Sequence, residues 1–531
     1  MIKIIFRFAL ILMLSISVFD FASINGQNSD YKKYINQDVT SSDRYTSGNI
    51  YQKDFLLFID LLKECHPSFA DGQIYPFDID RIKNEGYNWA STCKSTNELR
   101  TYLQSIATLL KDGHTSLVPI LDKKHIYPFI FFKENSSFIL NGIDEPYSSF
   151  IGKKIIEING KPVLDVVNSF RNAICSDNEI YYYDKVNSFM QMYSMWEGNP
   201  YSIKDSSLTF TFSDKTQIRL NPVSSDKIKI VKPPIKPNSI RVNTKEPFVY
   251  KLINEKSICY LQFNSCIDQC SLRSQYNMNR NVTNLSEEAF ENKVSKIPRF
   301  DLFLSDMFQA MKTNKISTLV IDVRDNPGGN SRLCDILLSW LKPIKDTKYQ
   351  NSFTRISKLW EQNFPALSAE YKELYSQMAK PYELGSLLDN QYLSTLINNA
   401  NNDNSISKKV DECFMANKDS SMIFDGNVVF IMNSKTYSSA SMLIINAVDN
   451  NIGTLIGEEG SFRPCSYGDI LSWELPNTMI NGFVSHKIFS RPNLNKCNEM
   501  SIKPDIEINQ TWSDIVEGND VFLNWVLSKY E

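Results

Sequence analysis

Hydrophobic residues recur at spacings of three and four in the early part of the chain, after a polar stretch at positions 28–48. The two sets are Phe55, Phe58, Leu61 and Leu62, followed by Leu99, Leu103, Ile106 and Leu110. This spacing places each set on one face of a helix and predicts amphipathic helices. We therefore expect residues 27–125 to form a small helical region.

Between residues 126 and 223 the hydrophobic period shortens toward that of β-strands. The predicted strands are Phe129–Phe132, Phe138–Leu140, Lys154–Ile158, Leu208–Phe212 and Gln217–Leu220. The dipeptide Asn159-Gly160 indicates a tight turn after the third of these strands. Residues 224–247 then carry five lysines and four prolines. That composition predicts an extended linker and a domain boundary.

After the linker, strands alternate with helices. The predicted strands are Ser257–Phe263, Ser317–Val323, Val428–Met432 and Thr454–Ile456, and the predicted helices are Asp301–Met311 and Ala440–Val448. Such alternation favours an α/β core with a largely parallel sheet over residues 248–531, interrupted by polar inserts near 275–297 and 345–422. Ligands gather at the carboxyl ends of strands in such sheets, so we look for the site there.

The first residues indicate export. Lys3 and Arg7 precede an apolar stretch from Phe8 to Phe19, and a small or polar run follows it. Twelve apolar-rich residues are too few to span a bilayer and are typical of a secretory signal. We expect residues 1–26 to be a signal peptide and the mature chain to be periplasmic or extracellular, with no membrane span.

Composition excludes several classes of protein. Lys and Arg number 57 against 60 for Asp and Glu, without a long run of one sign, so a nucleic-acid partner is not expected. Cys259, Cys266 and Cys270 lack the spacing of zinc ligands. No H-E-x-x-H, P-loop, G-x-G-x-x-G or G-x-S-x-G motif occurs. We therefore expect no metal and no cofactor.

Two short segments carry candidate chemistry. Gly328 and Gly329 follow Pro327 at the end of a predicted strand, where glycines permit a sharp turn with open amide groups. An oxyanion hole needs such amides, although an ordinary strand-to-helix turn has the same composition. The next strand runs into Ser438, Ser439 and Ser441 at a helix start, where one serine can cap the helix while another acts as nucleophile. These arguments do not choose among the three serines.

Five segments together resemble the C-terminal processing, or tail-specific, serine peptidases. Residues 322–329 (DVRDNPGG) and 436–460 (TYSSASMLIINAVDNNIGTLIGEEG) resemble the D-x-R-x-N-P-G-G, S-A-S-E and G-E-x-T segments of that family. Residues 111–115 (KDGHT) resemble its D-G-H-T turn, and 152–163 (GKKIIEINGKPV) resemble a PDZ strand and turn. Residues 499–506 (EMSIKPDI) are similar to its E-x-x-G-V-x-P-D-I end. The resemblance implies a crotonase/ClpP-like core preceded by a helical region and a PDZ-like β segment.

The resemblance also implies site residues. Ser439 occupies the first serine of S-A-S-E and would be the nucleophile, with oxyanion amides from Gly328, Gly329 and Ala440. The lysine that many members use as base is absent, because residues 460–464 read GSFRP. An arginine does not deprotonate in proteins, so it cannot replace that lysine.

Histidine is the alternative base, since its pKa suits proton transfer near neutral pH. The tricorn-like branch of the family uses a histidine in the D-G-H-T turn and a glutamate before P-D-I. His114 and Glu499 occupy these positions, which gives a Ser439, His114 and Glu499 triad, with Asp505 and Asp112 as alternative carboxylates.

The implied function is an exported serine peptidase that hydrolyses peptide or protein substrates through an acyl-enzyme. Met442 replaces the glutamate of S-A-S-E. Together with the missing lysine, this keeps open a catalytically inactive peptide-binding homologue of the same fold. A hydrolase of another acyl substrate is the third possibility.

Overall fold

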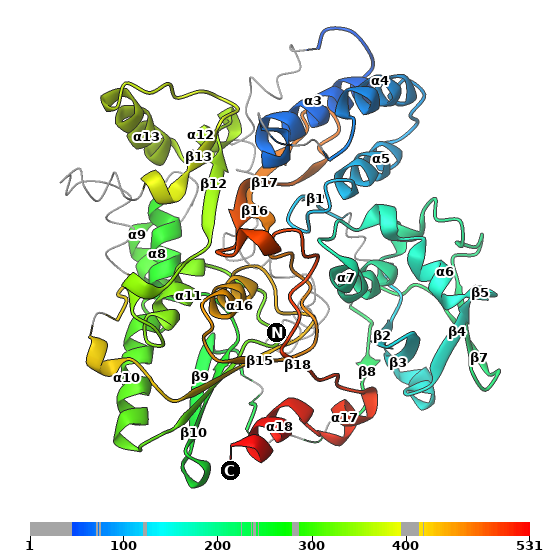
Figure 1. Cartoon of the computed structure of the whole chain (residues 1–531). Helices are drawn as coiled ribbons and strands as arrows, with labels where there is room; N and C mark the ends of the chain where they lie inside the picture. Colours follow the sequence, from blue (N-terminus) through cyan, green and yellow to red (C-terminus); the bar gives the residue numbers. More distant parts are fainter. Residues whose placement is uncertain are drawn as a thin grey trace.

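The computed structural model describes residues 45–530 except for 71–72, 74–75, 120–124, 225, 235, 237–239, 243, 279–285, 394–413 and 418. The expected signal peptide at 1–26 and parts of both expected inserts lie outside the described residues. Within the described part, three sheets and the helices around them make up the molecule (Figure 1).

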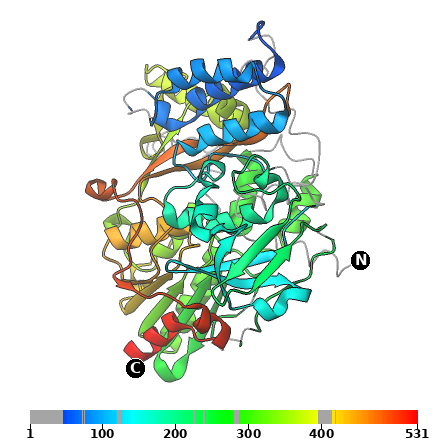
Figure 2. The same ribbon diagram turned by 90° about the vertical axis from the view of Figure 1, so that its right-hand side faces the viewer.

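The expected N-terminal helices are present as α3 (Ile50–Cys65), α4 (Ile79–Ala90) and α5 (Thr96–Thr108). They lie over a sheet of order β1-β17-β12-β13, in which β16 also pairs with β17. We call it the second sheet, after the core sheet described below. The strands of this sheet are β1 (Ser116–Leu117), β12 (Asn351–Arg355), β13 (Leu387–Asp389), β16 (Ser466–Glu474) and β17 (Asn481–Ser490). Phe55 and Phe58 share one core with Trp473 and Val484. Residues near both ends of the chain therefore build this layer, as the blue helices above the orange strands show in Figure 2.

A third sheet contains the predicted strand region. Its order is β2-β3-β4-β6-β7, with β5 on β4 and β8 on β3. The strands are β2 (Phe129–Glu134), β3 (Ser137–Asp144), β4 (Lys154–Ile158), β5 (Lys161–Pro162), β6 (Leu208–Phe212), β7 (Gln217–Leu220) and β8 (Ile230–Val231). The tight turn at Asn159-Gly160 is confirmed, because both residues have positive φ between the antiparallel strands β4 and β5. Helices α6 (Val163–Asn168) and α7 (Glu179–Gln191) belong to the same part of the chain.

The core sheet has the order β18-β15-β14-β11-β10-β9. Its strands are β9 (Phe248–Ile253), β10 (Ile258–Phe263), β11 (Thr318–Asp322), β14 (Asn427–Met432), β15 (Thr454–Gly457) and β18 (Ile506–Glu507). All neighbouring pairs are parallel except β9 with β10. The expected parallel α/β core is thus confirmed, and its near-continuous apolar strands are those of a sheet covered on both faces.

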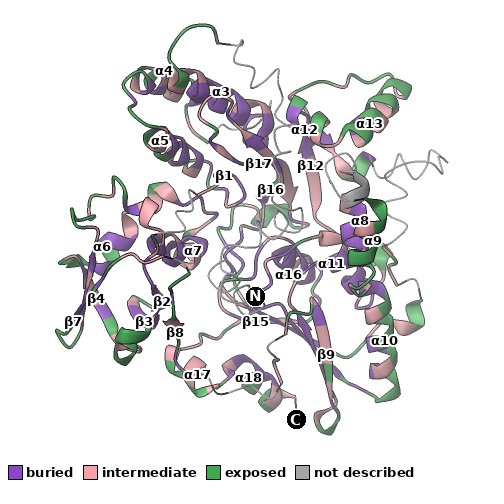
Figure 3. Cartoon of the chain, turned by 180° about the vertical axis from the view of Figure 1, so that it is seen from behind, coloured by how far each residue is buried: buried purple, intermediate pink, exposed green. Residues whose placement is uncertain are grey.

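Helices cover both faces of the core sheet, and their inner sides are buried (Figure 3). The helices of this part are α8 (Gln269–Met278), α9 (Glu287–Val294), α10 (Phe300–Thr313), α11 (Ser331–Leu338), α16 (Ser439–Asp449), α17 (Trp512–Glu517) and α18 (Val521–Lys529). Leu304, Leu337 and Leu443 from α10, α11 and α16 pack on one face. Phe522 and Val526 of α18 pack with Ile431 and Ile456 on the other.

The segment expected as an insert near 345–422 is partly built into the fold. Besides β12 and β13 it contains α12 (Lys358–Asn363) and α13 (Pro365–Gln377). β12 pairs antiparallel with β17, so this segment extends the second sheet. Among the described residues, no helix combines the length and hydropathy that a bilayer crossing requires.

Candidate active site

A buried charge network fixes the carboxyl end of β11. The guanidinium of Arg324 donates to the carboxylates of Asp322 and Asp520, both of them buried. Asp322 also accepts from Tyr260 at 2.6 Å and from Arg241 at 2.8 Å. Burial alone would raise the pKa of Asp322, but the charges of Arg324 and Arg241 outweigh it and lower that pKa. The ion pairs of Asp322 and Arg324 therefore hold the carboxyl end of β11 in place.

The Gly-Gly turn follows this anchor. Gly328 and Gly329 have φ values of +99° and +137°, which residues with a Cβ rarely adopt. The amide of Gly328 donates to the side-chain oxygen of Asn326 at 2.9 Å. The carbonyl of Gly328 and the amide of Asn330 bond to the backbone of Cys266. Within the described residues the amide of Gly329 has no acceptor, so Gly329 supplies an open N–H and Gly328 does not.

The hydroxyl groups of the three serines have three different hydrogen-bond partners. The hydroxyl of Ser438 lies 3.3 Å from Nε2 of His114. The hydroxyl of Ser439 donates to the carbonyl of Gly329 at 2.7 Å, and that of Ser441 donates to the carbonyl of Thr436 at 3.0 Å. The expected contact between His114 and Ser439 is therefore not formed. Ser439 is the first residue of α16 and its side chain turns toward the glycine turn, while the preceding residue faces the imidazole.

Ser438 has an unusual backbone. Its φ of +52° and ψ of −126° lie outside the regions that residues with a side chain ordinarily occupy. Such a conformation costs about 1–3 kcal/mol and persists only where the surroundings impose it. A Cβ on Gly328 would lie 2.8 Å from both the Cβ of Ser438 and the amide nitrogen of Ser439. The glycine turn therefore packs directly against this strained serine.

Two open amides lie beside Ser438. One belongs to Gly329, and the other to Ser439, whose N–H at the start of α16 has no acceptor among the described residues. The amide of Ala440, an expected oxyanion donor, instead donates to the carbonyl of Tyr437 at 3.2 Å. Of the three expected oxyanion amides, those of Gly328 and Ala440 have acceptors and that of Gly329 is open among the described residues, while the amide of Ser439 is open in place of that of Ala440.

His114 is buried among acidic and aromatic groups. Its Nδ1 lies 3.3 Å from the hydroxyl of Tyr437 and 3.7 Å from Oδ1 of Asp112. Its ring stacks on the ring of Tyr437 at 5.0 Å and meets Phe462 edge-on. Burial alone would lower the pKa of His114, but the neighbouring carboxylate of Asp112, followed by the charge of Asp177, outweighs it and raises that pKa. The surroundings thus stabilise the protonated imidazole.

Asp112 is the carboxylate nearest to that imidazole. Burial alone would raise the pKa of Asp112, but hydrogen bonds and charge from His114 and His66 hold that pKa well below its usual range. His66 was not anticipated as a site residue; its Nε2 lies 3.2 Å from Asp112 and its ring is fully buried. An ionised carboxylate is therefore held next to His114.

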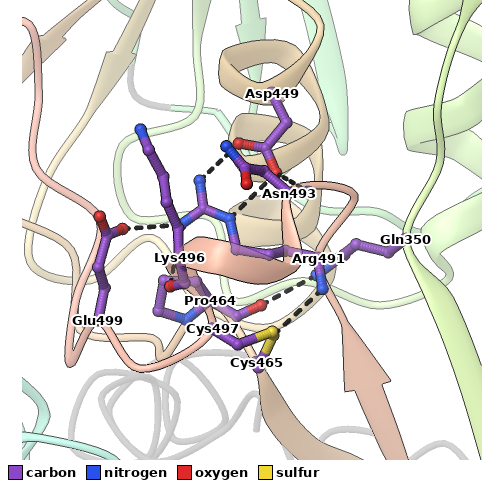
Figure 4. The surroundings of a disulfide bond; sticks show 9 residues. All are labelled: Gln350, Asp449, Pro464, Cys465, Arg491, Asn493, Lys496, Cys497 and Glu499. Atoms are coloured by element: carbon purple, nitrogen blue, oxygen red, sulfur yellow. Dashed lines mark hydrogen bonds and ion pairs between the residues drawn. A yellow bond between two sulfur atoms is a disulfide. The ribbon is translucent and has the colours of Figure 1, made fainter.

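The other two expected carboxylates lie elsewhere. Glu499 bonds to Arg491 at 2.7 Å, and its side chain is 47% exposed. Arg491 is in turn held by Asp449, next to the disulfide between Cys465 and Cys497 (Figure 4). Asp505 accepts from the amide of Leu455 at 2.8 Å. The structure thus does not bring Glu499 to His114, because the buried Arg491 takes its charge.

Lys435 does not replace the missing lysine base. Lys435 lies three residues before Ser438, and its ammonium is 3.9 Å from Asp325. Burial alone would lower the pKa of Lys435, but the charge of Asp325 and other acids outweighs it and raises that pKa. A lysine held protonated cannot accept the proton of a serine. Over the described ranges, no group of three or more His, Cys, Asp or Glu residues is placed to hold a metal ion.

Comparison with known proteins adds to this geometry. Residues 294–508 match peptidase family S41. These residues are a peptidase family S41 domain. The S41 domain contains the glycine turn, the three serines and Glu499, whereas His114 and Asp112 lie before it. The chain is thus a hydrolase of the serine peptidase class. No curated protein matches the chain by sequence.

Solved structures resemble the chain beyond the S41 domain. Mature CPAF in complex with lactacystin is 15% identical, with a TM-score of 0.58 over 90% of this chain and 98% of that one. A second structure of mature CPAF is 15% identical, with a TM-score of 0.56 over 90% and 96%. The photosystem II D1 C-terminal processing protease is 11% identical, with a TM-score of 0.37 over 87% and 94%. The CPAF likeness shows that the S41 domain and the segments before it share a known fold.

Sequence reasoning missed Tyr437 and Asp177 as well as His66. Tyr437 donates a hydrogen bond to Asp177, which precedes α7. The buried ring of Tyr437 carried one signal, since it lies between the end of β14 and the serines. Asp177 carried none, because nothing near it in the sequence links it to the S41 domain.

Proposed function

We propose that the chain is an exported serine peptidase that hydrolyses peptide bonds through an acyl-enzyme on Ser438, with His114 as general base. The contact of 3.3 Å between Nε2 of His114 and the hydroxyl of Ser438 carries this proposal. A serine hydroxyl is a weak nucleophile until an adjacent base accepts its proton, and this contact supplies that base.

The reaction follows from the geometry. His114 accepts the proton of Ser438 as the serine oxygen bonds to the substrate carbonyl carbon, and the carbonyl oxygen becomes an oxyanion. The open amides of Gly329 and Ser439 are the donors available to it, each commonly worth about 3 kcal/mol. His114 then gives its proton to the leaving amine as the peptide bond breaks, and a water molecule, deprotonated by the same imidazole, hydrolyses the ester.

We assign the site to the histidine-using rather than the lysine-using peptidases, and the contact between His114 and Ser438 supports this assignment. Asp112 takes the part that the resemblance gave to Glu499, since its ionised carboxylate lies closest to Nδ1 of His114. A nearby carboxylate stabilises the imidazolium that forms in each step without itself taking the proton.

Export is supported by two features of the chain. The apolar stretch behind Lys3 and Arg7 has the pattern of a secretory signal. The disulfide between Cys465 and Cys497 belongs to the kind of cross-link that persists in oxidising compartments. We therefore propose a periplasmic or extracellular enzyme acting on peptide or protein substrates, with the PDZ-like character of the third sheet remaining a prediction.

Labelling by a fluorophosphonate tests the proposed activity. The chain from residue 27 onward is expected to take one label, and His114→Ala is expected to slow labelling at least about 100-fold, as loss of a general base does. Casein digestion by the same preparation separates a peptidase from an esterase. A folded wild-type chain that takes no label and cuts no casein would instead support the inactive peptide-binding homologue.

A further inference from the structure

Behind His114 lies a second buried acid that the proposed reaction does not use. Asp177 accepts a hydrogen bond from the hydroxyl of Tyr437 through Oδ2 and from the amide of Gly113 at 3.3 Å through Oδ1. Both Asp177 and Tyr437 are buried, at 2% and 6% exposure. Tyr437 directly precedes Ser438, so the residue next to the candidate nucleophile holds this acid through its phenol.

We propose that Tyr437 and Asp177 form a positioning pair that selects the tautomer of His114 required by Ser438. This inference rests on the proposed function and adds to it a hydrogen-bonded chain from Asp177 through Tyr437 and His114 to Ser438. Neither residue touches the substrate, and both act through the imidazole.

The direction of each hydrogen bond follows from the donors available. An ionised carboxylate can only accept hydrogen bonds, so the phenol of Tyr437 donates its single hydrogen to Asp177. The phenol oxygen then offers a lone pair to Nδ1 of His114, 3.3 Å away. Nδ1 must carry the hydrogen to use that acceptor. Nε2 is left unprotonated and able to take the proton of Ser438.

Asp112 cannot fix the tautomer as well by itself. Its Oδ1 is 3.7 Å from Nδ1, beyond hydrogen-bond distance, and already accepts from the backbone amide of His114 at 2.9 Å. Its Oδ2 accepts from Thr115 and Ser485 and lies 3.2 Å from Nε2 of His66. Asp112 therefore supplies charge, and Tyr437 supplies the closer hydrogen-bond partner.

The charges around His114 agree with this arrangement. The acids that act on the imidazole are Asp112, Asp177 and Asp469, from three separate segments. Burial and the neighbouring charge of Asp112 raise the pKa of Asp177 to about 6. Asp177 is thus mainly ionised at and above neutral pH, where His114 must be neutral to act as a base. Burial and the charge of Asp177 keep the pKa of Tyr437 well above its usual range, so the phenol retains its proton.

Matched variants of two neighbouring tyrosines test the pair. Tyr437→Phe removes the phenol oxygen but keeps the ring that stacks on His114. Tyr181→Phe is the control, because its ring lies 4.7 Å from that of Tyr437 and its hydroxyl donates to the carbonyl of Gly113 rather than to His114 or Asp177. We expect Tyr437→Phe to slow fluorophosphonate labelling about 100-fold and Tyr181→Phe to label at the wild-type rate. Equal rates for Tyr437→Phe and wild type would overturn the proposal.

The pH dependence separates positioning from a structural role. Asp177→Asn keeps an acceptor for Tyr437 but removes a negative charge that favours protonated His114. The acidic limb of the labelling rate is therefore expected at lower pH in this variant than in wild type. A limb that does not move contradicts the pair, even if the variant is less stable.

A measurement on the wild-type chain tests the same proposal if the variants do not fold. The chain has four histidines, so selective ¹⁵N labelling of histidine resolves their tautomers by NMR. We expect a protonated Nδ1 and an unprotonated Nε2 for His114, and the opposite tautomer overturns the proposal. A folded wild type that does not react with the fluorophosphonate refutes the proposed function itself. A wild type that reacts, together with a Tyr437→Phe variant that reacts at the same rate, refutes only the positioning pair.

Discussion

Asp112 joins two histidines and the second sheet in one buried cluster. It accepts from the hydroxyls of Thr115 and Ser485 at 2.6 Å and 2.7 Å, and His66 and His114 flank it. Removing one partner of a buried charge pair leaves the other uncompensated, which costs about 3–5 kcal/mol. The aspartate is thus a structural residue as well as the nearest carboxylate to the imidazole.

Asp112→Ala is expected to lower the free energy of unfolding by about 3 kcal/mol at neutral pH. The pKa of Asp112 is lower in the folded chain than its ordinary value of 3.8. Its ionisation therefore contributes stability above that value, and the contribution is lost as the pH falls below it. Urea unfolding of wild type and variant at neutral pH and near pH 3 measures this, and the difference should shrink at acid pH.

Asp80→Ala is the matched control for that experiment. Its carboxylate pairs with Lys63 at 3.0 Å, but its side chain is 70% exposed. Exposed ion pairs contribute little, so its unfolding free energy should stay close to that of wild type. If Asp80→Ala and Asp112→Ala lower the free energy of unfolding equally, the buried cluster stabilises the fold no more than an exposed ion pair does.

At the scale of elements, the glycine turn between β11 and α11 meets the start of α16. A Cβ on Gly329 would lie 2.4 Å from the carbonyl oxygen of Cys266, and its φ of +137° is one that residues with a side chain rarely adopt. Gly329→Ala must therefore displace the turn and its open amide. Loss of one oxyanion donor costs about 100-fold in kcat, with a smaller effect on KM, and casein kinetics measure both.

Gly160→Ala separates backbone strain from damage to the site. Its φ is +68°, but a Cβ there meets nothing within 4 Å. It should cost about 1–2 kcal/mol of stability through the left-handed conformation and leave kcat unchanged. A Gly329→Ala variant that is no less active than Gly160→Ala would remove the glycine turn from the proposed oxyanion hole.

The elements of the core were the most predictable part of the chain. The four expected parallel strands and the helices α10 and α16 are present within two residues of the expected ends. Their apolar runs decide burial locally, so sequence periodicity suffices. The second sheet was not foreseen as a layer, because β12 pairs with β17 more than a hundred residues later. Such pairing depends on contacts that no local pattern records.

Within the site, the segments that the motifs name meet at the serines. His114 and Gly328 both lie against Ser438. Choosing between Ser438 and Ser439 needs the backbone angles of a strained turn, since one residue reverses where the side chain points. Glu499 fits its motif, yet Arg491 holds it through a contact that the motif cannot reveal.

At the scale of the whole molecule, the disulfide between Cys465 and Cys497 connects two long loops of the S41 domain. It closes a segment with a sequence separation of 32 residues. Phe462, which packs on His114 and Tyr437, lies just before this segment, and Glu499 lies just after it. The cross-link thus restrains the ends of both loops near the site.

Replacing both cysteines by serine is expected to lower the free energy of unfolding by roughly 3–4 kcal/mol, from the loop-closure entropy of a segment of this length. Denaturant unfolding of the double variant and wild type, both without reductant, measures the difference. Cys93→Ser is the control, because Cys93 is a free cysteine. A double variant as stable as wild type would show that the loops are held by packing alone.

The most direct test of the central claim is to identify the serine that the fluorophosphonate modifies. Mass spectrometry of the digested adduct locates the phosphonyl group within residues 436–442, and Ser438→Ala and Ser439→Ala provide independent confirmation. The structure predicts the group on Ser438, no label in Ser438→Ala and retained labelling in Ser439→Ala. An adduct on Ser439 that survives Ser438→Ala would contradict the account.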